Sequence, residues 1–218
     1  QATPAAFEVE YEKAREAGEA AVVIALTSKL SGTYQSAMIA AAEYENIYVV
    51  DSGSVAIGGA ILVEYALKLL NEGLEAKQIA EKLEEVKSRI VIVALVDTLE
   101  YLKKGGRLSS AVAVVGGLLN IKPILHVDGN GEIQMLSTAR GMKKAFATLT
   151  DLSEKEGGPD SEKPVMMGFT GSSDENMRKY LEENKAQWAC DAGKTIIGSA
   201  IGVHVGPGAV AVSFFSVE

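Results

Sequence analysis

The chain has 218 residues, 47% of them hydrophobic and 23% charged, a composition typical of a soluble globular protein with one large or two small domains. Its formal net charge of -8, without any block of Lys or Arg, argues against a nucleic-acid-binding surface and suits a cytoplasmic protein. The longest apolar stretches are too short to span a membrane, and one cysteine with two histidines argues against a disulfide framework or a zinc site.

The first predicted element is a helix close to the N-terminus. Thr3 followed by Pro4 fits an N-cap and a proline at the first helical position. Gly18 is a residue type that often ends a helix, because glycine adopts the left-handed conformation without a steric penalty. We therefore expect a helix between these residues.

Short apolar runs then alternate with helical patterns. The runs that suit strands covered on both faces are residues 20–26, 47–50 and 90–96. The helical patterns between them include those that begin after Gly32 and at Ala56. This alternation predicts an α/β domain with a largely parallel sheet.

The pattern changes in the second part of the chain. Residues 124–127 and 132–136, joined by turn residues, read as a β-hairpin, which an all-parallel sheet does not contain. Further elements are expected in this order: a helix from about Met142, a strand at 164–169, a helix near Ser173, and strands at 195–201 and 209–215. They predict a second α/β domain with a mixed sheet. We place the domains at residues 1–105 and 106–218, with a ligand cleft between them.

Two nucleotide-binding motifs are matched only formally. Residues 206–211 fit the G-x-G-x-x-A fingerprint, but a strand pattern follows where the motif requires a helix. Residues 193–195 resemble the end of a P-loop, yet Trp188 occupies the position of the required glycine. No G-x-S-x-G nucleophile motif is present either. The sequence therefore does not support autonomous kinase or ordinary hydrolase chemistry.

Residues 26–37, LTSKLSGTYQSA, crowd hydroxyl side chains between a predicted strand and a predicted helix. The N-terminus of a helix favours an anion, because its N–H groups are free and its dipole is positive there. Ser31 is the best-placed hydroxyl, and a carboxylate suits hydroxyls better than several phosphate groups do. The alternative is that Ser31 only caps its own helix.

Other polar residues are candidates for the same cleft. Arg107 follows a double glycine that can bend the chain and turn the guanidinium inward, where it could pair with a carboxylate. His204 could end a strand and point into the cleft, or it could be an ordinary core histidine. Asp51, at the end of a strand, could face a ligand or simply form a turn, and His126 in the hairpin is interpreted as structural.

Taken together, six separated blocks resemble the DegV family of bacterial fatty-acid-binding proteins. In chain order the blocks are LTSKLSGTYQSA, VVDSGSVAIGGA, DTLEYLKKGGRLS, LLNIKPIL, TARGMKKA and IGVHVGPGAV. The resemblance spans the chain from Gln1 to about Phe215. It implies a two-domain α/β protein that holds an acyl carboxylate at the domain junction and the acyl tail in an apolar tunnel.

The resemblance also implies roles for individual residues. The fatty-acid carboxylate would be bound by Ser31, with Gly32 and Thr33 beside it, and by Arg107 and His204. Arg140, in the TARG block, would engage a separate kinase subunit. Members of the family begin with additional strands, so we expect that this chain lacks an upstream segment of the first domain and one head-group ligand.

The leading hypothesis is a bacterial fatty-acid-binding protein, active in phospholipid synthesis, that presents the carboxylate of a long-chain fatty acid to a kinase subunit and performs no chemistry alone. No cofactor is expected besides this ligand. Residues 61–70, 111–121 and 166–169 are candidate tunnel walls, although ordinary core packing is the alternative for each. The competing hypothesis is an enzyme, similar to dihydroxyacetone kinase, that uses His204 on a small carbonyl or phosphorylated metabolite.

Overall fold

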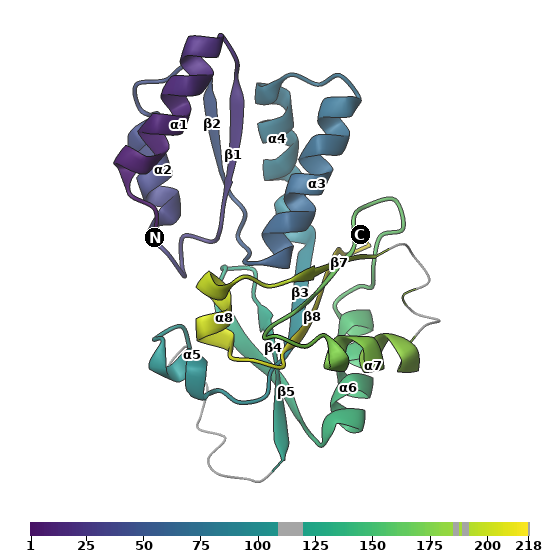
Figure 1. Ribbon diagram of the computed structural model, residues 1–218. Coiled ribbons are helices and arrows are strands. Elements are labelled where there is room, and N and C mark those ends of the chain that lie inside the picture. The colour runs from purple at the N-terminus through teal and green to yellow at the C-terminus, as the bar shows by residue number, and fades with distance from the viewer. Residues whose placement is uncertain (109–119, 185–187, 189–191, 218) are drawn as a thin grey trace.

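A computed structural model describes residues 1–108, 120–184, 188 and 192–217 of the chain. It has the predicted α/β architecture, with one two-stranded parallel sheet and one six-stranded mixed sheet. Figure 1 shows that the elements of residues 4–86 form one half of the molecule and that the six-stranded sheet with its helices forms the other. The domain boundary near residue 105 stays a prediction.

The first half contains a small sheet between two pairs of helices. Its elements are α1 (Pro4–Ala17), β1 (Ala21–Ala25), α2 (Thr33–Ala41), β2 (Ile47–Asp51), α3 (Ile57–Asn71) and α4 (Ala76–Val86). Strands β1 and β2 pair in parallel, with Ala21 opposite Ile47. Side chains alternate across the strands, so that Val23 packs with α1 and α2 while Ile24 packs with α3 and α4.

The predicted ends of the first helix are confirmed. The hydroxyl of Thr3 accepts a hydrogen bond from the Ala6 N–H at 3.3 Å, and Pro4 occupies the first turn. Gly18 ends the helix at φ 69°, in the left-handed region where glycine is favoured. Local sequence signals are sufficient to predict the two ends of this helix, because capping depends only on neighbouring residues.

The second half is built around the six-stranded sheet. Its elements are η1 (Lys87–Arg89), β3 (Ile90–Leu95), α5 (Glu100–Lys104), β4 (Ile121–Val127), β5 (Ile133–Arg140), α6 (Met142–Lys155), β6 (Met166–Phe169), α7 (Glu175–Glu183), β7 (Gly193–Ile196), α8 (Ser199–Val205) and β8 (Val210–Phe215). The strand order is β5-β4-β3-β8-β6-β7, with β6 and β7 parallel and the other pairs antiparallel. The predicted hairpin is β4–β5.

Two expectations about strands are wrong. Residues 90–96 were expected in the parallel sheet of the first half, but β3 lies at the centre of the six-stranded sheet, antiparallel to β4 and β8. Residues 195–201 were expected to form one strand, but β7 ends at Ile196 and α8 begins at Ser199. The sequence of a short apolar run does not determine which sheet the run joins. It also does not distinguish a strand from a segment of buried helix.

The six-stranded sheet is covered on both faces. One face, here called the α6 face, carries Val93, Ile124 and Val212 and packs against α6 and α7. The opposite face, here called the α8 face, carries Ile92 and Ala211 and is covered by α3, α5 and α8. In Figure 1, α5 and α8 lie on one side of the sheet, and α6 and α7 lie on the other.

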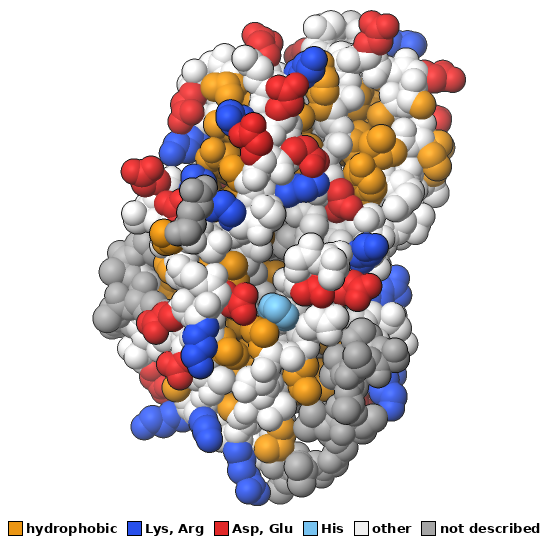
Figure 2. All heavy atoms as spheres, turned by 180° about the vertical axis from the view of Figure 1, so that it is seen from behind, with side chains coloured by type: hydrophobic (Ala, Val, Ile, Leu, Met, Phe, Trp, Pro, Cys, Tyr) orange, Lys and Arg blue, Asp and Glu red, His pale blue; other side chains and the backbone are white. Residues whose placement is uncertain are grey.

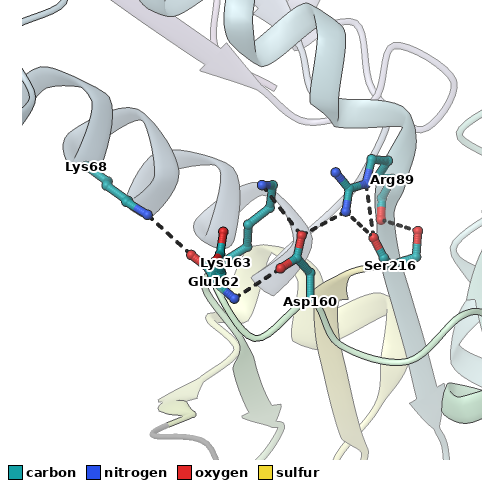
Figure 3. A network of polar contacts seen from close by, with 6 residues as sticks. All are labelled: Lys68, Arg89, Asp160, Glu162, Lys163 and Ser216. Atoms are coloured by element: carbon teal, nitrogen blue, oxygen red, sulfur yellow. Dashed lines mark hydrogen bonds and ion pairs between the residues drawn. The ribbon is translucent and has the colours of Figure 1, made fainter. Parts of the chain in front are cut away.

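A polar network joins the two halves at the start of β3 (Figure 3). The Arg89 guanidinium donates to the Asp160 carboxylate at 2.8 Å and to the Ser216 carbonyl at 3.0 Å. Lys163 lies 3.6 Å from the same carboxylate, and Lys68 on α3 donates to the Glu162 carbonyl at 3.3 Å. The network therefore fastens α3 and β3 to the loop before β6 and to the end of β8.

The described surface carries mixed charge. Figure 2 shows acidic and basic side chains interspersed over much of one face, with apolar side chains visible in both halves. On this face the pattern does not provide the continuous basic stripe that nucleic-acid binding requires. None of the helices within the described ranges is long and apolar enough to cross a membrane.

Replacing Asp160 with Asn should destabilise the fold at neutral pH. The Glu162 N–H, followed by Arg89 and Lys163, lowers the pKa of Asp160 below its ordinary 3.8. Its stabilisation is therefore complete above the ordinary pKa and is lost as pH falls through the lower folded-state value. Urea unfolding should show a loss of about 1 kcal/mol at pH 7, because the carboxylate is partly exposed.

The loss in the Asp160→Asn protein should shrink as the pH approaches the folded-state pKa. The control is Glu85→Gln, in the exposed pair with Lys82 on α4, which should change little. A pH-independent loss for Asp160→Asn would show that the carboxylate charge does not contribute.

Candidate functional site

The hydroxyl-rich loop after β1 lies against both halves of the molecule. The Thr27 N–H donates to the Ser54 carbonyl at 2.8 Å, and the Thr27 hydroxyl donates to the Gly131 carbonyl at 3.1 Å. Gly131 is in the β4–β5 turn at φ 82°, and a Cβ there would lie 2.1 Å from the Thr27 hydroxyl. Thr27 is not among the predicted site residues, although its place at the end of a strand could have indicated it.

Ser31 and Thr33 form a pair of hydroxyls at the start of α2. Their oxygens lie 2.8 Å apart, and the Ser31 oxygen accepts from the Thr33 N–H at 3.3 Å. Gly32 directly precedes α2, and the bond from the Thr33 N–H means that Ser31 helps to cap this helix, as the alternative interpretation allowed. Two hydroxyls share one hydrogen bond in this pair, which leaves one O–H able to donate to an anion.

Arg107 reaches the same loop from the second half. Its side chain is exposed, with Nη1 donating to the Gly105 carbonyl at 2.7 Å and Nε donating to the Leu30 carbonyl at 3.4 Å. Leu30 directly precedes Ser31, so the guanidinium and the hydroxyl pair are close in space although the residues are far apart in sequence. The bend at the double glycine is what turns Arg107 toward the loop.

His204 lies in the last turn of α8, and its expected place at the end of a strand is wrong. Its Nδ1 is buried and has no hydrogen-bond partner among the residues that the structure describes. The ring packs against Gly105, where a Cβ would lie 2.1 Å from Nδ1. An unsatisfied buried nitrogen costs free energy, so this position favours a ligand that supplies a partner.

These groups together suit one small anion. A guanidinium, a hydroxyl pair and an imidazole can supply donors to the two oxygens of a carboxylate. No group of three or more His, Cys, Asp or Glu side chains with metal-site geometry occurs in the part of the chain that the structure describes. The arrangement therefore resembles a binding site for a carboxylate more than a metal centre.

An apolar cavity of about 60 Å³ lies between the α8 face of the sheet and the helices above it. Its floor is formed by residues that share this face of the sheet: Ile92, Ala94, Val96, Leu125, Val127 and Ala211. Its other walls include residues of α5, α8 and the segment before α8: Leu102, Ile197, Ile201 and Val205. None of these side chains offers a charge or a hydrogen-bond donor to a phosphorylated ligand.

His126 borders the cavity, but its imidazole belongs to the other face. It pairs with Val93, whose side chain packs on the α6 face, and its Nδ1 lies 4.0 Å from Glu156 at the end of α6. Because side chains alternate along a strand, His126 contributes its backbone to the cavity. This placement fits the structural role that the sequence predicts for it.

The cavity and the polar groups share a boundary at α5 and α8. Leu102 lines the cavity three residues before Gly105, and Val205 lines it directly after His204. Both side chains pack in one apolar cluster with Ala209. A molecule with a carboxylate and an apolar tail could therefore contact the polar groups and the cavity at once.

The backbone is strained where the first half meets the cavity. Ala56, the residue before α3, lines the cavity and has φ 51° and ψ −120°, a conformation that L-residues rarely adopt. Strain of this kind costs about 1–3 kcal/mol and concentrates at ligand sites. The apolar VAIGG stretch contains no sequence signal for it.

Other predicted residues lie away from this boundary. Asp51 accepts hydrogen bonds from the Ser28 and Gly53 N–H groups, so it orders the loop, as the turn interpretation allowed. Arg140 is exposed and is the last residue of β5, whereas Ile133, which lines the cavity, is the first. An eight-residue strand separates its two ends by roughly 23 Å. The structure therefore does not bring Arg140 to the polar groups.

The expected tunnel walls differ from the observed lining. Residues 61–70 belong to α3 and 166–169 to β6, and neither segment lines the cavity. Residues 111–119 lie outside the described residues. The actual lining comes mainly from β3, β4, β8 and α8. Their proximity depends on the strand order, which could not be predicted from the sequence.

Replacing Gly105 with Ala should displace His204. Gly105 has φ −77°, which alanine adopts freely, so the main obstacle to the added methyl group is the imidazole nitrogen at 2.1 Å, and the Tyr101 carbonyl oxygen lies farther away at 3.2 Å. A crystal structure of the variant should show the ring moved, with little loss of thermal stability. Gly129→Ala is the control, since no atom lies within 4 Å of the point that its Cβ would occupy. An unmoved His204 ring would contradict the contact.

Comparison with known proteins gives a consistent result. A model of the family described as "Uncharacterised protein, DegV family" matches residues 1–217. A DegV domain-containing protein of Caldanaerobacter subterraneus is 34% identical, over 98% of this chain and 77% of its own.

Two solved structures are similar over all of this chain. A DegV family protein from Thermus thermophilus, described as binding fatty acid, has a TM-score of 0.87 and 29% identity, with 78% of its chain covered. A DegV lipid-binding protein from Thermotoga maritima has a TM-score of 0.86 and 27% identity, with 77% covered. The fold, the matched residues and these relatives together show that the chain belongs to the DegV family.

Proposed function

We propose that this protein binds one long-chain fatty acid, with the acyl tail in the apolar cavity and the carboxylate at Ser31, Thr33, Arg107 and His204. The observation that carries the proposal is the shared boundary at α5 and α8, where an apolar cavity meets a buried imidazole nitrogen without a described partner. The relatives that bind fatty acid or lipid support the same ligand class.

The tail would supply most of the affinity. Burying a methylene group contributes about 0.8 kcal/mol, whereas a neutral hydrogen bond contributes only about 1 kcal/mol net. The cavity of about 60 Å³ is smaller than the roughly 150 Å³ cavity that holds a benzene molecule, so the lining must open to admit an acyl chain. The head-group residues would therefore fix the orientation of the ligand more than its affinity.

The finer proposal is that the bound carboxylate is presented to a separate kinase subunit. A carboxylate oxygen would attack the terminal phosphorus of a nucleotide held by that partner, which forms an acyl phosphate and releases the nucleoside diphosphate. Arg107 and His204 would offset charge that develops during the transfer. The protein alone would perform no chemistry, and Arg140 would contact the partner.

The competing hypothesis of an enzyme for a small phosphorylated metabolite has weaker support. Such a ligand would need several fixed donors, and the cavity beside His204 is lined by apolar side chains. Conversion of a small carbonyl compound or a phosphorylated sugar by the purified protein alone would favour that enzyme.

Native mass spectrometry of the purified protein, before and after incubation with palmitic and oleic acid, tests the binding proposal. We expect one long-chain fatty acid per chain, identified after solvent extraction. A protein that stays empty after incubation, or that carries only a phosphorylated metabolite, would contradict the proposal.

Ser31→Ala should weaken fatty-acid binding by about fivefold, the effect of one lost hydrogen bond of about 1 kcal/mol. The rate of acyl release, measured with a fluorescent fatty acid, should rise by a similar factor while the melting temperature changes little. Ser161→Ala, at an exposed position in the loop before β6, is the matched control. An unchanged release rate for Ser31→Ala would remove this residue from the head-group site.

Arg140→Ala should leave fatty-acid binding intact, because Arg140 lies at the end of β5 that is far from the cavity. Formation of acyl phosphate with a kinase subunit added should fall by more than about tenfold if this residue contacts the partner. The control is Arg178→Ala, which removes an exposed arginine from α7. Equal losses of lipid binding and of phosphorylation would show that the partner role is misassigned.

A further inference from the structure

Small side chains line up across the centre of the α8 face. Ala94 of β3 lies directly opposite Ala211 of β8, and Ala211 lies opposite Gly168 of β6. The row is closed at both ends. Ile57 and Ile197 fill the space above Gly168, within 2.9 Å of where its Cβ would be, and Leu125 lies opposite Ala94 on β4.

The two alanines in the middle of this row form part of the cavity floor. Ala94 and Ala211 both line the cavity, and larger lining residues flank Ala94. These are Ile92, two residues away on the same face of β3, and Leu125, opposite Ala94 on β4. The floor is therefore low where the two alanines meet, and added methyl groups there would enter the cavity.

A third alanine lies closer to the polar groups. Ala209 precedes β8 by one residue and shares a face with Ala211, because side chains alternate along the chain. It packs in one cluster with Leu102 and Val205, the residues at the boundary with Gly105 and His204. A chain that starts at the polar groups would thus pass Ala209 before it reaches the pair Ala94 and Ala211.

We propose that these three alanines set how long an acyl chain the protein accepts once the lining has opened. The inference rests on the proposed function, since it takes the carboxylate at His204 as the fixed end of the ligand. A larger side chain at any of the three positions would stop the chain at that point. Ala94 and Ala211 face each other across one strand pair, so both should stop it at the same length.

The test compares Ala94→Val, Ala211→Val and Ala209→Val with the unchanged protein. Competition binding with saturated fatty acids from decanoic to stearic acid gives the chain-length preference of each. We expect Ala94→Val and Ala211→Val to lower the affinity for stearic acid relative to lauric acid by about tenfold, as when about two methylene groups stay unburied. Ala209→Val should shift the preference to still shorter chains.

Ala139→Val is the matched control. Ala139 is buried on β5 in the core of the α6 face, away from the cavity, so added methyl groups there should lower the melting temperature and leave the preference unchanged. The Ala94 and Ala211 variants should melt no lower than the unchanged protein, because their methyl groups enter the cavity, whereas Ala209→Val should melt somewhat lower, because Ala209 packs in a cluster with Leu102 and Val205. If a valine variant does not fold, Ala211→Cys should give a smaller shift in the same direction.

The binding measurements have three outcomes. If the Ala94 and Ala211 variants accept the same maximum chain length, and Ala209→Val accepts only shorter chains, the inference is supported. An unchanged preference in all folded cavity variants overturns it while fatty-acid binding itself stands. If the unchanged protein binds none of the fatty acids, the proposed function fails, and the inference falls with it.

Discussion

The structure depends on an unfavourable boundary between an apolar cavity and a buried polar nitrogen. An apolar cavity forfeits packing contacts, and a buried imidazole nitrogen without a described partner forfeits a hydrogen bond. One molecule with a carboxylate and an apolar tail would offset both costs, whereas a purely apolar or purely ionic ligand would offset only one. The two costs lie side by side because Leu102 lines the cavity from α5 and His204 lies in the last turn of α8.

The strand order places this boundary in the second half of the molecule, next to the hydroxyl-rich loop of the first half. Because β3 joins the six-stranded sheet, its α8 face forms the cavity floor, and the chain that leaves β3 through α5 delivers Arg107 to the carbonyl of Leu30. The β4–β5 turn contacts Thr27 from the other side. The hydroxyl loop is thus held by two segments of the second half, while the network around Arg89 fastens the halves on the side of α3.

Much of the fold could be predicted from local sequence signals, and less of the site. Thr3, Pro4 and Gly18 mark α1 because caps depend on neighbouring residues, and the turn before β5 indicates a hairpin for the same reason. The assignment of β3 to its sheet and of His204 to a helix depends on tertiary contacts. The resemblance to DegV proteins indicated Ser31, Arg107 and His204, but Gly105 and the alanines of the floor emerge only from strand register and close approach.

A crystal structure of the protein with a bound long-chain fatty acid would show where each end of the ligand lies. We expect one carboxylate oxygen within hydrogen-bonding distance of the Ser31–Thr33 pair, a polar partner for His204, and the tail over Ala94 and Ala211. A fatty acid bound outside the cavity, or in the cavity with its carboxylate at the end away from α5 and α8, would contradict the proposal.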